Sequence, residues 1–256
     1  MLEEPAQAQP TGGTCGEGGK PAEGMMNRVS TLFRGRTGAP GAENRALREH
    51  RSDRGAPRGG APRGDAPWGD APWDALALAV ILLAGILVLL TFRDYGVTWD
   101  EDVHHWYGKL VLDYYLSGFK DLRALDWQDL HNYGAAFDLT AAVLNRFSSL
   151  GVYETRHLLN GLVGILGLVG CWKLGRALGG PRAGFIAVLF LLLTPNYYGQ
   201  MFNNPKDIPF AAGVAWAIYY QVLILRRLPR PPLSLLLRLG LAIGMTMGVR
   251  VGGLVL

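Results

Sequence analysis

Long apolar runs in the second part of the chain constrain its fold more than any other feature. They cover residues 75–92, 157–172, 183–198, 208–225 and 233–256. An α-helix needs about 20 such residues to cross a bilayer core. Within lipid, backbone polar groups must be satisfied internally. The sequence therefore predicts an all-α, polytopic transmembrane helical bundle with about five spans in residues 74–256.

The first 73 residues have a different composition, rich in Gly, Pro, Ala and Arg, and they repeat themselves weakly. Segments of this kind cannot build a core, so we expect residues 1–73 to form a disordered tail. Its arginines could touch nucleic acid or anionic lipid. We favour the simpler interpretation of a cytosolic extension and expect no nucleic-acid partner. The two cysteines, Cys15 and Cys171, are too far apart to indicate a disulfide framework or a zinc site.

The charges between the apolar runs predict how the chain is oriented. Basic residues occupy the tail and the links at 173–182 and 226–230, whereas the segments on the other side are acidic. The positive-inside rule then places the tail in the cytosol and Asp100 outside it. We therefore expect an integral protein of a bacterial inner or plasma membrane, with the Asp100 loop in the periplasm or outside the cell.

Residues 93–156 form an outer loop that is too long to be a simple connector. Apolar side chains recur at helical spacing from Val103 to Tyr114, which predicts an amphipathic helix lying in the membrane interface. A second, weaker helix is predicted over residues 135–147. A plain connector on the surface remains the alternative. Two interfacial helices behind a pair of carboxylates favour a platform that holds an active site.

Regularly spaced glycines predict close packing between the membrane helices. One series recurs every three residues from Gly161 to Gly170, and another every four residues from Gly240 to Gly252. Small residues at such spacing allow a neighbouring helix to approach closely within lipid.

Several charged residues near the span ends are candidates for a site. Asp100 and Glu101 directly follow the first span, and Lys206 and Asp207 precede the fourth. Asp100 could be a solvated loop acid or a helix cap, and Asp207 a helix N-terminal acid. Lys206 could simply snorkel to headgroups. Arg250 lies within the apolar run 233–256, where a cation is costly and usually functional, although snorkelling is again the alternative.

Two segments resemble a known family. The Thr98-Trp-Asp-Glu101 start of the outer loop, the helices behind it and the Asn204-Pro-Lys-Asp-Ile-Pro-Phe210 segment resemble family 39 membrane glycosyltransferases. This group includes dolichyl-phosphate-mannose protein mannosyltransferases and aminoarabinose transferases, which have the GT-C fold. The resemblance covers about residues 75–256.

The resemblance implies transfer of a sugar from a polyprenyl-phosphate carrier to a hydroxyl of a protein, lipid or glycan acceptor, with inversion. Asp100 is then the candidate base, and Glu101 would orient it or help to bind the acceptor. Asp207, Lys206, Arg250 and His104 are candidate substrate-binding residues, with Arg250 paired to the donor phosphate. No cofactor is expected. A divalent metal bound by Asp100 with His104 and His105 is less favoured, because adjacent histidines point different ways on a helix and no further ligand is evident.

Other functions remain open at this stage. In a transporter or channel subunit, Arg250 and the acids would line a path. A non-catalytic membrane scaffold would need none of these placements. Relatives of the resembled family have more spans, so the sequence predicts only an N-terminal part, which could be an inactive truncated fragment.

Overall fold

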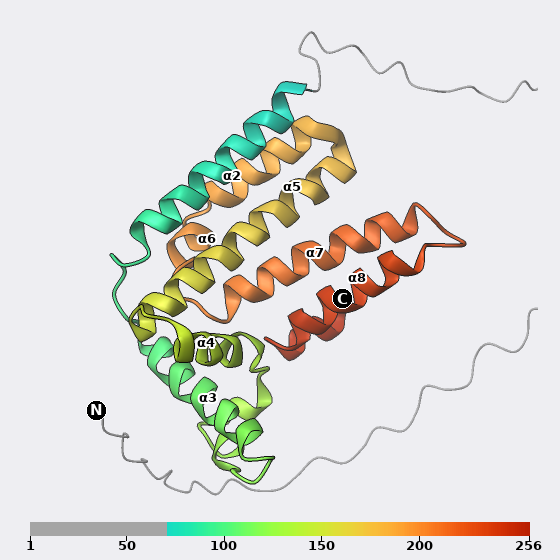
Figure 1. Ribbon diagram of the computed structural model, residues 1–256. Helices are drawn as coiled ribbons and strands as arrows, with labels where there is room; N and C mark the ends of the chain where they lie inside the picture. Colours follow the sequence, from blue (N-terminus) through green and yellow to red (C-terminus); the bar gives the residue numbers. More distant parts are fainter. Residues whose placement is uncertain (1–70) are drawn as a thin grey trace, which may run out of the picture. The chain divides into compact units, whose positions relative to one another are not determined.

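A computed structural model describes residues 71–256, and every regular element in that range is helical. The predicted all-α fold class is therefore confirmed for this part of the chain, while the predicted tail lies almost wholly outside it. The longer elements, drawn in Figure 1, are α2 (Ala71–Thr91), α3 (Trp99–Leu116), α4 (Ala136–Phe147), α5 (Val152–Leu193), α6 (Pro195–Gln200), α7 (Asp207–Leu225) and α8 (Leu233–Met247). Three short 3-10 turns are η1 (Arg123–Leu125), η2 (Leu130–Asn132) and η3 (Val251–Val255).

Helix α2 is apolar on all sides, as a helix surrounded by lipid and protein should be. One stripe, made of Ala77, Ile81, Ala84 and Val88, is buried in the core that α2 shares with α5. The spacing of four, three and four residues places this stripe on one helix face. Leucines on its other faces are exposed, which is the arrangement expected where a helix meets acyl chains.

Helix α5 is a hairpin with two legs. Gly180 breaks it with φ 82° and ψ −176°, a backbone conformation that only glycine adopts readily, and Pro181 begins the second leg. A Cβ at Gly184 would lie 3.0 Å from the Trp172 carbonyl oxygen, so the legs pack backbone to backbone. Figure 1 shows the second leg returning beside α2. The second leg ends at Leu193, where the Thr194–Pro195 step starts α6.

Among the described residues, α2, α5 and α7 are long and apolar enough to cross a membrane, whereas α8 is shorter. The run 233–256, predicted as one span, is helical only to Met247 and then forms η3. A continuing helix would use the Gly248 carbonyl for the N–H four residues later. That carbonyl instead accepts a hydrogen bond of 2.8 Å from the Ala136 N–H. The start of α4 is thereby joined to the end of α8.

The glycines of the three-residue series in α5 lie where side chains of other elements pack closely against this helix. A Cβ at Gly161 would be 2.6 Å from a Val88 methyl carbon, and one at Gly164 would be 2.4 Å from the side chain of Met201. In α8, by contrast, a Cβ added at Gly240 or Gly244 would meet no atom within 4 Å. Their face of α8 has no partner within the described residues.

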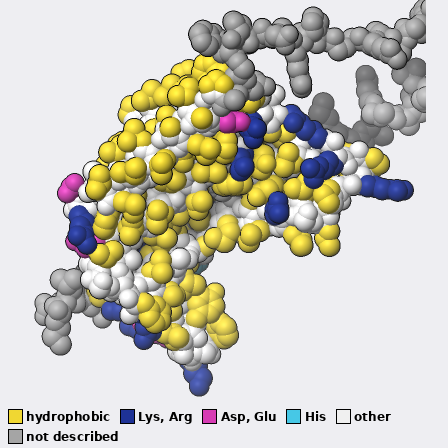
Figure 2. Space-filling model, turned by 45° about the horizontal axis from the view of Figure 1, so that its top comes forward, with side chains coloured by type: hydrophobic (Ala, Val, Ile, Leu, Met, Phe, Trp, Pro, Cys, Tyr) yellow, Lys and Arg dark blue, Asp and Glu magenta, His cyan; other side chains and the backbone are white. Residues whose placement is uncertain are grey.

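Ion pairs and hydrogen bonds join the helix ends at one end of the bundle. Arg176, near the α5 turn, lies 2.9 Å from Asp74 at the start of α2. Arg226, after α7, donates a hydrogen bond to the Ala177 carbonyl. Figure 2 shows a group of Lys and Arg side chains at the upper right of a broadly hydrophobic surface, with others at its left and lower edges. The predicted assignment of this end to the cytosol stays a prediction.

The segment between α2 and α5 folds as α3 and α4 with the two short turns η1 and η2. The two helices predicted there thus form, at nearly the predicted residues. Tyr107, Leu110 and Val111 on α3 pack against Ala124 and Leu130. This part of the apolar face of α3, expected to lie in the interface, is therefore covered by protein.

The contact between α3 and α4 depends on Gly108. A Cβ at this position would lie 2.4 Å from the Asp138 carbonyl oxygen, which belongs to the backbone and cannot rotate away. We expect Gly108→Ala to lower the free energy of unfolding by about 1–3 kcal/mol, as overpacking does. The measurement is the unfolding of the purified protein in detergent, followed by circular dichroism.

The matched control is Gly85→Ala in α2, where a new Cβ would meet nothing within 4 Å. Alanine is a better helix former than glycine, so this change should be neutral or stabilising by up to about 1 kcal/mol. Equal losses of stability in the two variants would contradict the close packing at Gly108.

Candidate functional site

Asp100 and Lys206, which are far apart in the sequence, meet at the end of the bundle formed by the starts of α3 and α7. The Lys206 Nζ lies 3.2 Å from an Asp100 carboxylate oxygen. The Asp100 side chain is 60% exposed and that of Lys206 is 22% exposed. The ring of Tyr133 lies 5.9 Å from the Lys206 ammonium. Asp100 can therefore meet a solute, while Lys206 is held beneath it.

A second pair of opposite charges joins the start of α7 to the segment after α8. Arg250 contacts the Asp207 carboxylate through its Nη1. Arg250 was predicted inside a membrane helix, but it lies beyond the end of α8 in extended backbone. Its side chain is 38% exposed and paired with a carboxylate, so its charge is not that of an unpaired cation in a helix interior.

The loop before α7 is fixed by hydrogen bonds to its surroundings. Asn160 of α5 donates to the Asn204 carbonyl, and the Thr98 hydroxyl donates to the Asn203 carbonyl. The Asn204 side chain in turn accepts from the backbone N–H groups of Lys206 and Asp207. These bonds hold the 203–207 loop beside the start of α3, and they place Lys206 and Asp207 on the same end of the bundle as Asp100.

Glu101 does not lie with Asp100 at the exposed cluster. It is 1% exposed, and its carboxylate accepts the Thr98 N–H at 2.9 Å, which is one half of a capping box at the start of α3. The other carboxylate oxygen lies 2.8 Å from His157 Nε2, although the two groups are not aligned for a hydrogen bond. Glu101 thus ties α3 to α5.

His104, predicted to bind substrate, is also buried and belongs to a polar network below the surface. Its Nδ1 lies 2.7 Å from the Asp138 carboxylate, whose other oxygen accepts from Arg156 at 2.6 Å. All three side chains are at most 4% exposed. Because Asp138 lies on α4 and Arg156 on α5, one carboxylate links three helices. His104 is therefore a structural partner of Asp138 and does not face the exposed cluster.

Asp138, Arg156 and His157 are central residues that sequence reasoning did not find. Asp138 looked like one acid among many in an outer loop, and Arg156 and His157 looked like the polar edge of a span. The position of Asp138 on its helix could have indicated that it is buried. On α4 it shares a face with Ala141 and Ala142, both of which are buried. An acid on a buried face needs a charged or hydrogen-bonding partner.

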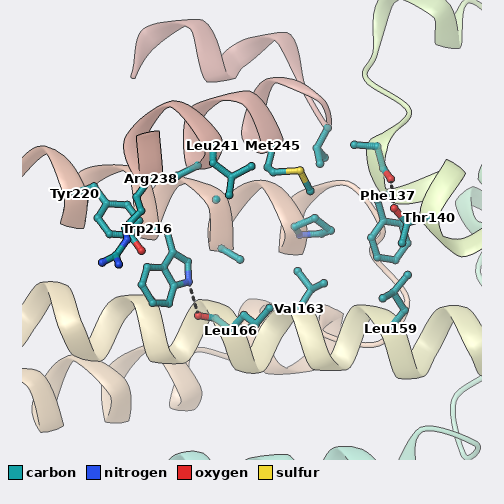
Figure 3. Close-up of a pocket in the computed structure, with 16 residues that line it drawn as sticks. Phe137, Thr140, Leu159, Val163, Leu166, Trp216, Tyr220, Arg238, Leu241 and Met245 are labelled. Carbon is teal, nitrogen blue, oxygen red and sulfur yellow. Dashed lines mark hydrogen bonds between the residues drawn. The ribbon is translucent and has the colours of Figure 1, made fainter. Parts of the chain in front are cut away.

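An apolar groove adjoins the exposed charged cluster. It has a volume of about 430 Å³ and lies between α5, α7, α8 and the start of α4. Figure 3 shows Phe137 and Thr140 at one end, Tyr220 and Arg238 at the other, and Val163 facing α8. Pro209 and Val249 also line it, and these residues directly neighbour the segments that carry Asp207 and Arg250.

The groove is long enough to hold part of a chain molecule. Along α7 it extends from Pro209 to Tyr220, which at 1.5 Å per residue is about 16 Å. Its volume falls within the range of small-molecule sites. Among the described residues, no group of three or more His, Cys, Asp or Glu side chains could hold a metal ion.

Taken together, these features define an all-helical membrane protein with paired charges at one bundle end and an apolar groove leading away from them. Residues 139–256 match the family model described as dolichyl-phosphate-mannose-protein mannosyltransferase. The match covers a little under half of the chain, and over that stretch it confirms the family resemblance inferred from the sequence. This family implies membrane glycosyl transfer of the GT-C type.

The matched stretch includes Lys206, Asp207, Arg250 and nearly the whole groove, but it does not include Asp100, Glu101 or His104. No curated protein and no solved structure matched the chain. The family match therefore supports the kind of reaction, whereas the roles of individual residues rest on their geometry.

Removing the Asp138 charge should destabilise the protein strongly. Asp138→Asn keeps the shape of the side chain but leaves Arg156 buried without a counter-ion. Breaking one partner of a buried ion pair costs roughly 3–5 kcal/mol. The measurement is the shift of the unfolding transition in detergent relative to the unchanged protein.

The control removes an equivalent charge from an exposed pair. Asp113 lies 3.7 Å from Arg123, and both side chains are at least 40% exposed. Surface pairs contribute about 0–1 kcal/mol, so Asp113→Asn should have little effect. If Asp138→Asn proved as mild as this control, the network would not hold the three helices together.

Proposed function

We propose that this protein transfers a sugar from a polyprenyl-phosphate donor to an acceptor hydroxyl at the membrane face that carries Asp100. The observation that carries the proposal is that the apolar groove is continuous with the charged cluster, because it reaches the residues next to Asp207 and Arg250. A donor of this kind has an apolar chain joined to a phosphate and a sugar. The groove suits the chain, and the charged cluster suits the phosphate and the sugar.

The cations at the cluster suit a phosphate ligand. Arg250 and Lys206 each have an acidic partner, Asp207 and Asp100, and each is partly exposed. A phosphate entering between them would give the guanidinium of Arg250 a bidentate partner. It would also give the ammonium of Lys206 a second negative charge to neutralise.

The proposed reaction is a single displacement. The acceptor oxygen forms a bond to the anomeric carbon while the bond from that carbon to the phosphate oxygen breaks. The electron pair of the broken bond goes to the polyprenyl phosphate, which Arg250 and Lys206 stabilise. Asp100 takes the proton of the acceptor hydroxyl. A single displacement inverts the anomeric centre.

Glu101 and His104 have a positioning role in this proposal, because both are buried beneath the start of α3. Glu101 fixes the first turn of α3, on which Asp100 lies, through its bond to Thr98. His104 fixes the same helix to α4 through Asp138. The first turn of α3 is thus held from two sides, as a catalytic carboxylate requires.

Transport is less well supported than transfer. Of the described residues that line the groove, Arg238 alone carries a charge, and a path for a polar solute would need more polar groups along its length. A scaffold role gives no reason for an apolar groove that ends at two ion pairs.

Asp100→Asn tests the proposed base. Loss of a general base costs about 10²–10⁴-fold in rate, so transfer from labelled polyprenyl-phosphate hexoses in membranes should fall by that order. The control is Asp94→Asn, which removes another exposed acid from the same loop and should leave transfer unchanged. Absence of transfer by the unchanged protein, or equal transfer by both variants, would contradict the proposal.

Filling the groove tests the donor site. Val163→Trp places a large ring in the groove, so we expect the KM for the lipid donor to rise about tenfold or more while the fold is kept. Leu162→Trp is the matched control, because Leu162 is the adjacent residue, is 44% exposed and does not line the groove. A similar donor KM in the two variants would show that the donor chain binds elsewhere.

A further inference from the structure

A second cavity, separate from the groove, lies between α3 and α4. Its volume is about 410 Å³, and its lining includes His105, Lys109, Asn145, Arg146 and Val152. None of these residues lines the groove or belongs to the charged cluster at Asp100. This cavity has no role in the proposed transfer reaction.

Polar atoms of the residues that line the cavity lack hydrogen-bond partners. Both the amide nitrogen and the amide oxygen of Asn145 are buried without a hydrogen bond, and so is Nδ1 of His105. Unsatisfied buried polar groups are costly and call for a ligand or water. Because these atoms are shielded from solvent, a ligand reaches them only after the side chains change rotamer, and they can then donate to and accept from an oxygen-rich group.

The cavity also has an excess of positive charge. Lys109 and Arg146 line it together with Asp113, which lies 3.7 Å from Arg123. Burial, and then the charges of Arg156 and Lys109, lower the pKa of His105. The imidazole therefore remains neutral at pH 7, and Lys109 and Arg146 supply the cationic groups for an anion.

Neighbouring residues are of the kinds that meet a membrane interface. Val152 is the first residue of α5, one of the helices long and apolar enough to cross a membrane. The Lys109 ammonium lies 4.7 Å from the ring centre of Trp106, and tryptophans concentrate at membrane interfaces. On α4, Phe147 is 83% exposed next to Arg146, which offers an apolar surface for an acyl chain.

We propose that the cavity between α3 and α4 binds the phosphate headgroup of an anionic membrane phospholipid. Lys109 and Arg146 pair with the phosphate. A change of side-chain rotamer lets Asn145 and His105, whose polar atoms are buried without partners, hydrogen-bond to its oxygens or to the headgroup hydroxyls. Phe147 contacts the start of an acyl chain. The bound lipid would fasten the α3–α4 unit to the membrane surface.

The test measures lipid binding by the purified full chain in detergent, by native mass spectrometry and by the thermal unfolding midpoint. The ligands are phosphatidylglycerol, phosphatidylcholine and inorganic phosphate. We expect phosphatidylglycerol to bind most tightly and to raise the midpoint. The double variant Lys109→Gln/Arg146→Gln should bind it roughly tenfold more weakly or worse, because each basic residue contributes to anionic-lipid affinity.

Two further variants make the result specific. Arg93→Gln/Lys120→Gln removes two charges from the same outer segment but outside the cavity, and it should bind phosphatidylglycerol as the unchanged protein does. Asn145→Asp, nearly the same shape with a negative charge, should weaken binding as the double variant does. Each variant's midpoint without lipid shows that it is folded.

Three outcomes would overturn the proposal. Equal weakening in the control pair would show general surface attraction in place of a site. Equal binding of phosphatidylcholine would show that the site does not select lipids by their net negative charge. Protection by inorganic phosphate at the same concentration would identify a free-phosphate site without a lipid. None of these measurements involves sugar transfer, so a failure of this proposal would not by itself contradict the proposed function.

Discussion

The buried carboxylate of Asp138 makes the interaction on which the arrangement of the segment between α2 and α5 depends. It bridges His104 of α3 and Arg156 of α5 from its own position on α4. A charge in this position is stable only with its partners, because the desolvation of an unpaired carboxylate or guanidinium costs several kcal/mol. The three helices are thereby held in one arrangement, and the first turn of α3 is held over the start of α7.

That arrangement explains how residues far apart in the chain form one surface. Asp100 depends on α3 for its position, Lys206 and Asp207 depend on the loop fixed by Asn160 and Asn204, and Arg250 depends on the end of α8. The α8 end is set by the bond from Ala136 to Gly248. The same bond lies at the end of α8, beside the end of the groove that neighbours Arg250. The helix end, the ion pairs and this end of the groove therefore depend on one another.

Much of the fold could be predicted because its signals are local. The apolar runs predicted α2 and α7, and helical periodicity predicted α3 and α4. The three-residue glycine series predicted the face of α5 on which other elements pack closely. The end of α8 was not predicted, because residues 249–256 are as apolar as the helix before them. Gly248 at the helix end and the pair Gly252-Gly253 were local signals for a stop. The hydrogen bond from the Ala136 N–H to Gly248 adds a partner from another part of the chain.

The site was predictable in part for the same reason. Asp100, Lys206, Asp207 and Arg250 were recognisable as charges at span ends, but their pairing depends on tertiary contacts between distant segments. Glu101 and His104 share the first turns of α3 with Asp100, and sequence alone does not show that their side chains point inward. Asp138 and Arg156 were missed because a single buried ion pair has no periodicity to reveal it.

The central claim is that the groove and the charged cluster form one site for a polyprenyl phosphate. Photo-crosslinking of a diazirine-bearing polyprenyl phosphate to the purified protein, with the labelled peptides mapped by mass spectrometry, tests it most directly. The account predicts labelling of α7 and α8 residues that line the groove, such as Leu241 and Met245, and weaker labelling by the corresponding polyprenol without phosphate. Equal labelling by both molecules, spread over the exposed leucines of α2, would contradict it.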